Sequence, residues 1–206
     1  MKQQLKIAFW MTVVTTILFG IAYPLMVTAL AQMLFPAQAN GDLIRKNDVV
    51  IGSTLIGQPF SSPGYFYSRP SNANYDGLNS GGTNLGPTNR RLIERVEANV
   101  GDLQAEEAGL PIPVDLVTAS ASGLDPHLSL AAAEFQIPRV ARQRGMSVAQ
   151  VGALVRRHTE GRQFRILGEP RVNVLELNLD LDAVRPLHHS ETAPAGESAS
   201  LGGSKR

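Results

Sequence analysis

The sequence predicts an α+β fold in three parts: a single N-terminal transmembrane helix, one compact mixed α/β domain, and a disordered C-terminal tail. Three observations support this prediction. Residues 7–35 contain no charged side chain, and about 20 apolar residues in a helix suffice to cross a bilayer. Residues 40–183 combine strand-like and helix-like patterns over the length of one ordinary domain. Residues 184–206 are dominated by Pro, Ala, Ser and Gly, a composition typical of disordered chain.

The charges that flank the membrane segment predict its orientation. Lys2 and Lys6 lie just before it, so the positive-inside bias places residues 1–6 in the cytoplasm. The domain of residues 40–183 is then extracytoplasmic. A cleaved signal peptide is the alternative, because residues 29–31 and 37–39 have the small-x-small form of a cleavage site. The apolar core is longer than the about 15 residues usual in signal peptides, which favours a retained anchor.

Small residues recur at every fourth position of this segment: Ala8, Thr12, Thr16, Gly20, Pro24 and Thr28. Such a face lets two membrane helices approach closely, and Thr can hydrogen-bond across the contact. The pattern predicts a partner helix packed against Thr12, Thr16, Gly20 and Pro24. Because proline removes an intrahelical hydrogen bond, we expect a kink at Pro24.

Four stretches of the domain have apolar patterns that predict strands. Three are short: residues 49–53, 55–57 and 114–118. In residues 175–181, four leucines alternate with polar side chains, which predicts a half-buried strand. Residues 40–48 are expected to form a polar connector.

Two stretches are expected to lack regular structure. Residues 60–70 are rich in aromatic side chains and prolines, which favours a packed but irregular edge. Residues 71–89 are rich in Asn, Ser and Gly and predict a long loop; loops of this length are usually functional or mobile.

Helices are predicted over residues 90–100, 130–136, 138–145 and 148–158. Thr88 or Asn89 is expected to cap the first of these, and Ser129 the second. Ser147 and Gln150 have the spacing of a capping box at the start of the last.

Composition excludes several classes of function. The 19 basic and 18 acidic side chains give a net charge of +1, so nothing global indicates nucleic-acid binding. The chain has no cysteine, which excludes disulfides, thiol catalysis and zinc sites built on Cys.

Two kinds of catalytic site are conceivable from residues 118–127. A hydrolase could use Ser120 or Ser122 with His127 and Asp125, but no Gly-x-Ser-x-Gly elbow is present. A metal site could use Asp125, His127 and His158, but the spacing matches no known metal motif. A structural turn is favoured over both.

Residues 81–88 have the Gly-x-x-x-x-Gly frame of a phosphate-binding loop, but Pro87 stands where the lysine is needed. A Gly-rich nest before a helix can still bind an anion. A flexible loop is the favoured interpretation. The stretch from Glu134 to Arg171 contains eight arginines and three glutamates, which favours a solvated face; anionic headgroups, an acidic partner or a nucleotide are the alternatives.

Several motifs, in this order along the chain, resemble the C subunit of the Kdp potassium-transporting ATPase. They cover residues 52–58, 65–71, 80–85, 117–127 (VTASASGLDPH), 138–141, 158–162 and 167–178. The resemblance extends over nearly the whole chain to about Asp182, and the tail lies outside it.

The resemblance implies an accessory, non-catalytic subunit of a bacterial inner-membrane complex. Its partners would be a potassium-binding pore subunit and a P-type ATPase catalytic subunit, with no metal or cofactor of its own. The family is described as a catalytic chaperone that raises the ATP affinity of the catalytic subunit. ATP would be bound mainly by that subunit, and K+ would be carried by the pore subunit. The family motif is expected to be structural, with the residues Thr118, Ser120, Ser122, Gly123, Asp125, Pro126 and His127.

Residues 78–83 loosely resemble the signature motif of ABC transporters. This resemblance implies nucleotide contact through Ser80, Gly81, Gly82, Thr83 and Asn84. An extracytoplasmic domain conflicts with that contact, because ATP is cytoplasmic. We therefore expect a role in assembly and at the entrance of the potassium pathway, and an exported hydrolase using Ser120, Ser122 and His127 is the alternative.

Overall fold

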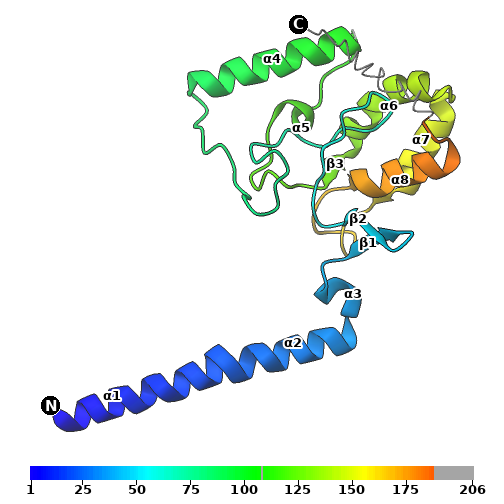
Figure 1. Cartoon of the computed structure of the whole chain (residues 1–206). Coiled ribbons are helices and arrows are strands. Elements are labelled where there is room, and N and C mark those ends of the chain that lie inside the picture. Colours follow the sequence, from blue (N-terminus) through cyan, green and yellow to red (C-terminus); the bar gives the residue numbers. More distant parts are fainter. Residues whose placement is uncertain (108, 188–206) are drawn as a thin grey trace, which may run out of the picture.

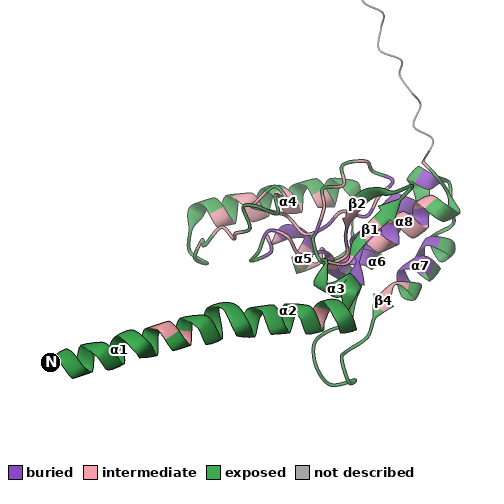
Figure 2. Cartoon of the chain, turned by 60° about the horizontal axis from the view of Figure 1, so that its bottom comes forward, coloured by how far each residue is buried: buried purple, intermediate pink, exposed green. Residues whose placement is uncertain are grey.

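The computed structural model describes residues 1–107 and 109–187 of the chain. Its N-terminal part is one helical rod, built from α1 (Lys2–Thr15), the π-helical segment η1 (Thr16–Ala22) and α2 (Tyr23–Leu34) (Figure 1). Residues Lys2–Leu34 are long and apolar enough to cross a membrane, and the rod has no buried residue. It lies apart from the rest of the protein and is exposed over almost its whole length (Figure 2).

Pro24 does not produce a sharp kink, and the reason is the π-helical turn that precedes it. The N–H of Tyr23 donates to the carbonyl of Leu18, five residues earlier, which is the i→i+5 bond of a π-helix. The wider turn rearranges the hydrogen bonds next to the residue that has no N–H of its own. Figure 1 therefore shows a continuous rod.

A short helix, α3 (Pro36–Ala39), leads to an antiparallel hairpin of β1 (Leu43–Lys46) and β2 (Val49–Ser53). The predicted strand at residues 49–53 is confirmed. The predicted polar connector instead contains β1, because Asn47 and Asp48 adopt the positive φ angles of a tight hairpin turn. Residues 55–57 form a turn and not a strand.

The second sheet has three short antiparallel strands in the order β3-β5-β4. They are β3 (His127–Ser129), β4 (Thr159–Glu160) and β5 (Arg171–Asn173). Within the described residues, the domain has five helices: α4 (Arg90–Glu106), α5 (Val114–Val117), α6 (Leu130–Arg144), α7 (Val148–Arg157) and α8 (Val174–Val184). This is a mixed helix and sheet domain, as the sequence predicted.

The predicted helix caps are confirmed. The Asn89 side chain accepts from the N–H of Arg91 at the start of α4, and Ser129 accepts from Ala132 at the start of α6. Ser147 and Gln150 form the reciprocal capping box of α7. Helix α4 extends six residues beyond the predicted end at residue 100.

Three further predictions of secondary structure are wrong. Residues 175–181 belong to helix α8, which Asn173 caps by accepting from the N–H of Glu176. Residues 114–117 form the single turn α5. The segments on either side of Pro138 are one helix, α6, since the carbonyl left without a partner belongs to Glu134 on the exposed face.

The core lies between α6, α7, α8 and the three-stranded sheet. Its fully buried members include Phe66, Leu128, Val140, Val172 and Leu177. Residues 60–70 form the predicted irregular edge, and residues 71–89 the predicted loop. Of the predicted disordered tail, Val184 is still part of α8 and residues 188–206 lie outside the described residues.

Candidate functional site

The family-motif loop, residues 117–127, runs from the end of α5 to the start of β3 and crosses the N-terminal loops of the domain. The N–H of Ser120 donates to the carbonyl of Pro70, and the carbonyl of Leu124 accepts from Gly57. The carbonyl of Pro126 accepts from the N–H of Val174, at the start of α8. The motif therefore ties three separate segments of the chain together.

Gly123 is the sharpest turn of this loop, with a φ of 70° in the left-handed region. A Cβ atom there would lie 2.8 Å from the Cβ of Ala73 and 3.1 Å from the carbonyl oxygen of Gly81. The carbonyl of Gly123 accepts a 2.6 Å hydrogen bond from the hydroxyl of Ser71. Both the conformation and the close approach of neighbouring backbone require glycine here.

Asp125 is the electrostatic centre of the motif. Its Oδ2 lies 3.2 Å from Nη1 of Arg69, and its Oδ1 accepts from the N–H of His127 at 3.0 Å. Burial alone would raise the pKa of Asp125, but the hydrogen bonds from His127 and Arg69 together hold it below its ordinary value. Arg69 also reaches Oγ1 of Thr118 at 3.5 Å. Asp125 is thus a charged anchor of the turn.

The serines of the motif are not arranged as nucleophiles. Ser120 is buried, and the hydroxyl of Ser122 accepts from the N–H of Leu124 at 3.1 Å. Within the described residues, neither hydroxyl is hydrogen-bonded to His127. The imidazole Nδ1 of His127 instead lies 3.7 Å from Oδ1 of Asp125. The arrangement lacks the nucleophile–base contact that a hydrolase needs.

The Gly-rich segment of residues 80–84 lies against the motif. Ser122 offers its carbonyl to two donors, the N–H of Gly81 at 2.8 Å and the hydroxyl of Ser80 at 3.0 Å. A Cβ on Gly82 would lie 2.7 Å from the carbonyl oxygen of Ala121. Thr83 and Asn84 follow, and Asn84 has a positive φ of 52°. The backbone donor that a phosphate nest would offer at Gly81 is therefore already occupied within the chain.

The candidate metal ligands are separated between two sites. His158 lies at the end of α7, with Nε2 2.9 Å from Oδ2 of Asp180 in α8, whereas His127 contacts Asp125. Among residues 1–107 and 109–187, no group of three or more His, Cys, Asp or Glu side chains could hold a metal ion.

An open cavity of about 500 Å³ borders the motif. Arg69 and Asp125 supply its charged groups, and Leu55, Ile56 and Leu124 supply apolar wall. The exposed side chains of Leu55 and Ile56 lie in the turn that the sequence had predicted as a strand. This cavity is the concave part of the site formed by residues 117–127.

A second set of polar residues, which the sequence did not single out, holds residues 63–68 between two helices. Asn178 of α8 accepts from the N–H of Phe66 at 2.9 Å and donates to its carbonyl at 3.0 Å. Gln136 of α6 does the same for the next residue, accepting from the N–H of Tyr67 at 2.8 Å and donating to its carbonyl at 3.2 Å. Two side-chain amides therefore replace a neighbouring β-strand.

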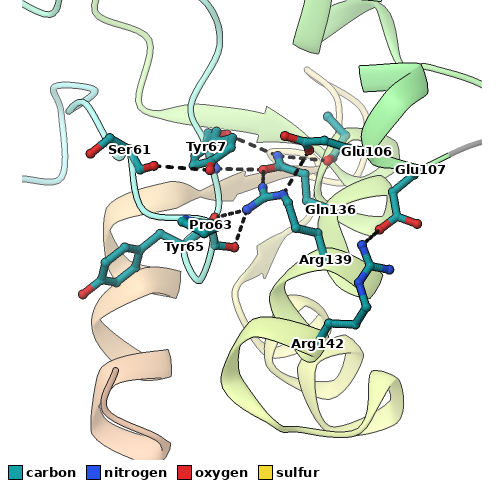
Figure 3. A network of polar contacts seen from close by, with 10 residues as sticks. Ser61, Pro63, Tyr65, Tyr67, Glu106, Glu107, Gln136, Arg139 and Arg142 are labelled. Carbon is teal, nitrogen blue, oxygen red and sulfur yellow. Dashed lines mark hydrogen bonds and ion pairs between the residues drawn. The ribbon is translucent and has the colours of Figure 1, made fainter. Parts of the chain in front are cut away.

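Two buried arginines, Arg139 and Arg144, complete this network, and Figure 3 shows Arg139 with its contacts. Arg139 donates to the carbonyls of Pro63 and Tyr65 at 2.6 and 2.9 Å, and its guanidinium lies 4.0 Å from the ring centroid of Tyr67. Burial lowers the pKa of Arg139, and Tyr67 and Glu106 partly oppose that change. Arg144 donates to the carbonyl of Gly64 at 2.6 Å. The only signal of this network in the sequence is that Gln136, Arg139 and Arg144 occupy positions on the otherwise apolar face of α6.

The small residues at every fourth position of the rod wind less around its axis than they would in an unbroken α-helix. At about 100° per residue, positions 8 to 28 of an unbroken α-helix would turn through about 200°. A π-helical turn, closed by i→i+5 bonds, holds more residues than an α-helical turn, so η1 removes part of this rotation. Thr16 and Gly20 lie in η1, and Pro24 lies two residues after its end. The stripe therefore becomes compatible with a single neighbouring helix.

Comparison with known proteins identifies the family. The family model described as "K+-transporting ATPase, c chain" matches residues 5–183. A potassium-transporting ATPase KdpC subunit of Koribacter versatilis is 61% identical over 189 residues, covering 91% of this chain and 98% of the relative. The KdpC subunits of Sorangium cellulosum and Methylococcus capsulatus are 56% and 54% identical over 190 residues, each covering 90% of this chain and 100% of the relative. The chain thus belongs to the KdpC family, the c chain of K+-transporting ATPases.

Proposed function

We propose that this chain is a non-catalytic accessory subunit that is needed to assemble a potassium-uptake ATPase and to couple ATP hydrolysis to K+ import. Its partners are a pore subunit that carries K+ and a P-type ATPase subunit that binds ATP. The observation that carries the proposal is the rod α1–η1–α2. It has no buried residue within the chain, and it presents a straightened stripe of small residues. Such a stripe supports close packing against a helix of another subunit.

The charges beside the rod support the proposed placement of the domain outside the membrane. Lys2 and Lys6 precede an uncharged stretch that ends at Asp42, which favours an N-terminus in the cytoplasm of a bacterium and a domain outside the inner membrane. In that position the domain lies beside the outer entrance of the potassium pathway and away from ATP. An increase in the ATP affinity of the catalytic subunit is then indirect, a coupling free energy transmitted through assembly.

The contacts of residues 80–84 support an indirect effect on ATP. The N–H of Gly81 and the hydroxyl of Ser80 are both directed at the carbonyl of Ser122. A nucleotide would have to displace these contacts. Titration of the full chain in detergent with ATP should give no saturable binding; saturable binding that Gly82→Ala abolishes would establish direct contact instead.

Packing of the rod can be tested by co-purification of the complex. Gly20→Leu places a large side chain on the small-residue face and should reduce recovery of the other subunits. Ala22→Leu is the matched control, because it adds a similar volume in η1, two residues away and on a different side of the helix. Equal recovery from both variants would contradict the proposed packing face.

The position of the domain can be tested separately. Protease added to intact spheroplasts should digest residues 40–183 if the domain is outside the membrane. A domain that survives in spheroplasts but is digested after the membrane is broken would be cytoplasmic, and the proposed place beside the potassium entrance would be wrong.

A further inference from the structure

The loop between β4 and β5 exposes apolar side chains to an unusual degree. Every residue from 161 to 169 is exposed, and Phe164, Ile166 and Leu167 have 87%, 76% and 58% of their surface accessible. Exposed apolar side chains that lie together commonly mark a contact with a membrane or another protein. Nothing in the core packing or in the motif of residues 117–127 uses this loop.

The loop is a built hairpin and not a loose connection. Gln163 and Leu167 exchange two backbone hydrogen bonds of 2.9 Å, and the N–H of Ile166 donates to the carbonyl of Gln163. Phe164 and Arg165 form its tip with φ values of 52° and 64°. Bulky residues rarely adopt this region, and such backbone strain persists where the surrounding structure fixes it.

In the part of the chain that the structure describes, the other charged side chains of the hairpin form ion pairs, whereas Arg165 at the tip does not. Arg162 donates to both carboxylate oxygens of Glu169 at 2.7 Å. Nearer the sheet, Nε of Arg171 lies 2.9 Å from Oε2 of Glu160. Within the described residues, Arg165 has no ion pair. The tip therefore combines an aromatic ring, two aliphatic side chains and an uncompensated positive charge.

The base of the hairpin lies where the membrane rod joins the domain. Asp42, three residues after α3, lines the same cavity as Glu160 and Arg171, which flank the loop. Figure 2 shows the loop running out from β4, away from the domain and on the side where α3 joins it. Five residues in each arm extend about 16 Å. Because Asp42 is the eighth residue after the end of α2, the tip is within reach of the bilayer surface.

We propose that the tip of residues 163–167 inserts into the headgroup region of the bilayer that the rod crosses, with Arg165 against anionic phospholipid. Aromatic and aliphatic side chains beside an arginine suit the chemistry of that interface, and the positive charge is attracted to anionic lipid. The proposal requires that the rod spans the membrane. It does not depend on which side the domain lies, or on the role in the pump.

The experiment uses the full chain in vesicles that contain no other subunit. Trp10 is the only tryptophan, so Trp10→Phe gives a background in which Phe164→Trp reports on the tip. The vesicles are phosphatidylcholine with or without phosphatidylglycerol, each with and without lipid brominated high on the acyl chain. Val148→Trp in the same background is the control: Val148 is 57% exposed and lies at the opposite end of α7, about 15 Å from β4.

We expect the Phe164→Trp indole to emit further to the blue than the control and to be quenched by brominated lipid, most strongly with phosphatidylglycerol. Adding Arg165→Glu should reduce the quenching in the anionic vesicles. Quenching that does not depend on phosphatidylglycerol would contradict the proposal that the tip binds an anionic lipid surface. An indole as water-exposed as the control would overturn the insertion, as would shielding that arises only when the other pump subunits are co-assembled.

Discussion

Removal of the Asn178 side chain tests the idea that amide side chains replace a β-strand beside residues 63–68. Asn178 is 1% exposed and satisfies both the N–H and the carbonyl of Phe66. In Asn178→Ala these two buried groups lose their partners, at about 1–3 kcal/mol each. The expected loss is about 2–6 kcal/mol, a large part of the roughly 5–15 kcal/mol of a typical domain.

The assay is urea unfolding of the full chain in detergent, followed by far-ultraviolet circular dichroism. Asn72→Ala is the control, because Asn72 is exposed and makes no side-chain hydrogen bond within the described residues, so the substitution should change stability by less than about 0.5 kcal/mol. A loss below about 1 kcal/mol for Asn178→Ala would refute the reasoning, since water or a shifted backbone would then be satisfying Phe66.

Asn178→Asp tests the same idea through the direction in which the stability of the variant changes with pH. Burial raises the pKa of a carboxyl group, so the folded state of this variant binds its proton more tightly than the unfolded state does. Only the protonated group can donate to the carbonyl of Phe66. The variant should therefore gain stability relative to the unchanged protein as pH falls from about 8 to 5. A difference between the two proteins that is independent of pH would contradict this account.

Two further predictions concern the motif of residues 117–127. Gly123→Ala should cost about 1–3 kcal/mol because of its φ of 70° and the Ala73 contact, whereas Gly86→Ala, with no atom within 4 Å of the new Cβ, should be nearly neutral in the same urea titration. Asp125→Asn should lose at most about 1 kcal/mol at neutral pH, since the pair with Arg69 is partly exposed. The lowered pKa means that the carboxylate stabilises the fold above the ordinary value of 3.8 and that this contribution is lost as pH falls through the folded-state pKa. The loss of stability caused by Asp125→Asn should therefore become smaller at acidic pH. A loss that becomes larger at acidic pH would contradict the lowered pKa of Asp125.

The sequence predicted local structure correctly wherever one or two neighbouring side chains determine the backbone conformation. Asn89, Ser129 and the Ser147–Gln150 pair each satisfy N–H groups at a helix start, and each was predicted from its own position. The apolar rod, which is long enough to cross a membrane, was predicted for a similar reason, because its length and lack of charge are properties of one continuous segment.

Helix α8 was missed because its pattern depends on tertiary contacts. Four of the five buried positions, Val174, Leu177, Asn178 and Leu181, have helical spacing. The polar Asn178 hides this spacing in the sequence, and the leucines alone alternate like a strand. Only the backbone of Phe66, 112 residues earlier, makes a buried asparagine favourable there. The arginines that fix residues 63–65 were missed on the same ground, since their acceptors are carbonyls that carry no sequence signal.

The extended backbone around Phe66 also constrains the order in which a nascent chain can mature. Its partners on α6 and α8 are made late, and the bond from Tyr65 to Asp182 spans 117 residues. The rod leaves the ribosome first and can enter the bilayer while these partners are still unsynthesised. Until the last helix arrives, residues 63–68 have unpaired backbone groups, and such a tethered intermediate is exposed to quality-control proteases. A chain whose synthesis stops before residue 178 should insert its rod but leave the domain unfolded. The domain can therefore fold and resist proteolysis only after helix α8 has been completed.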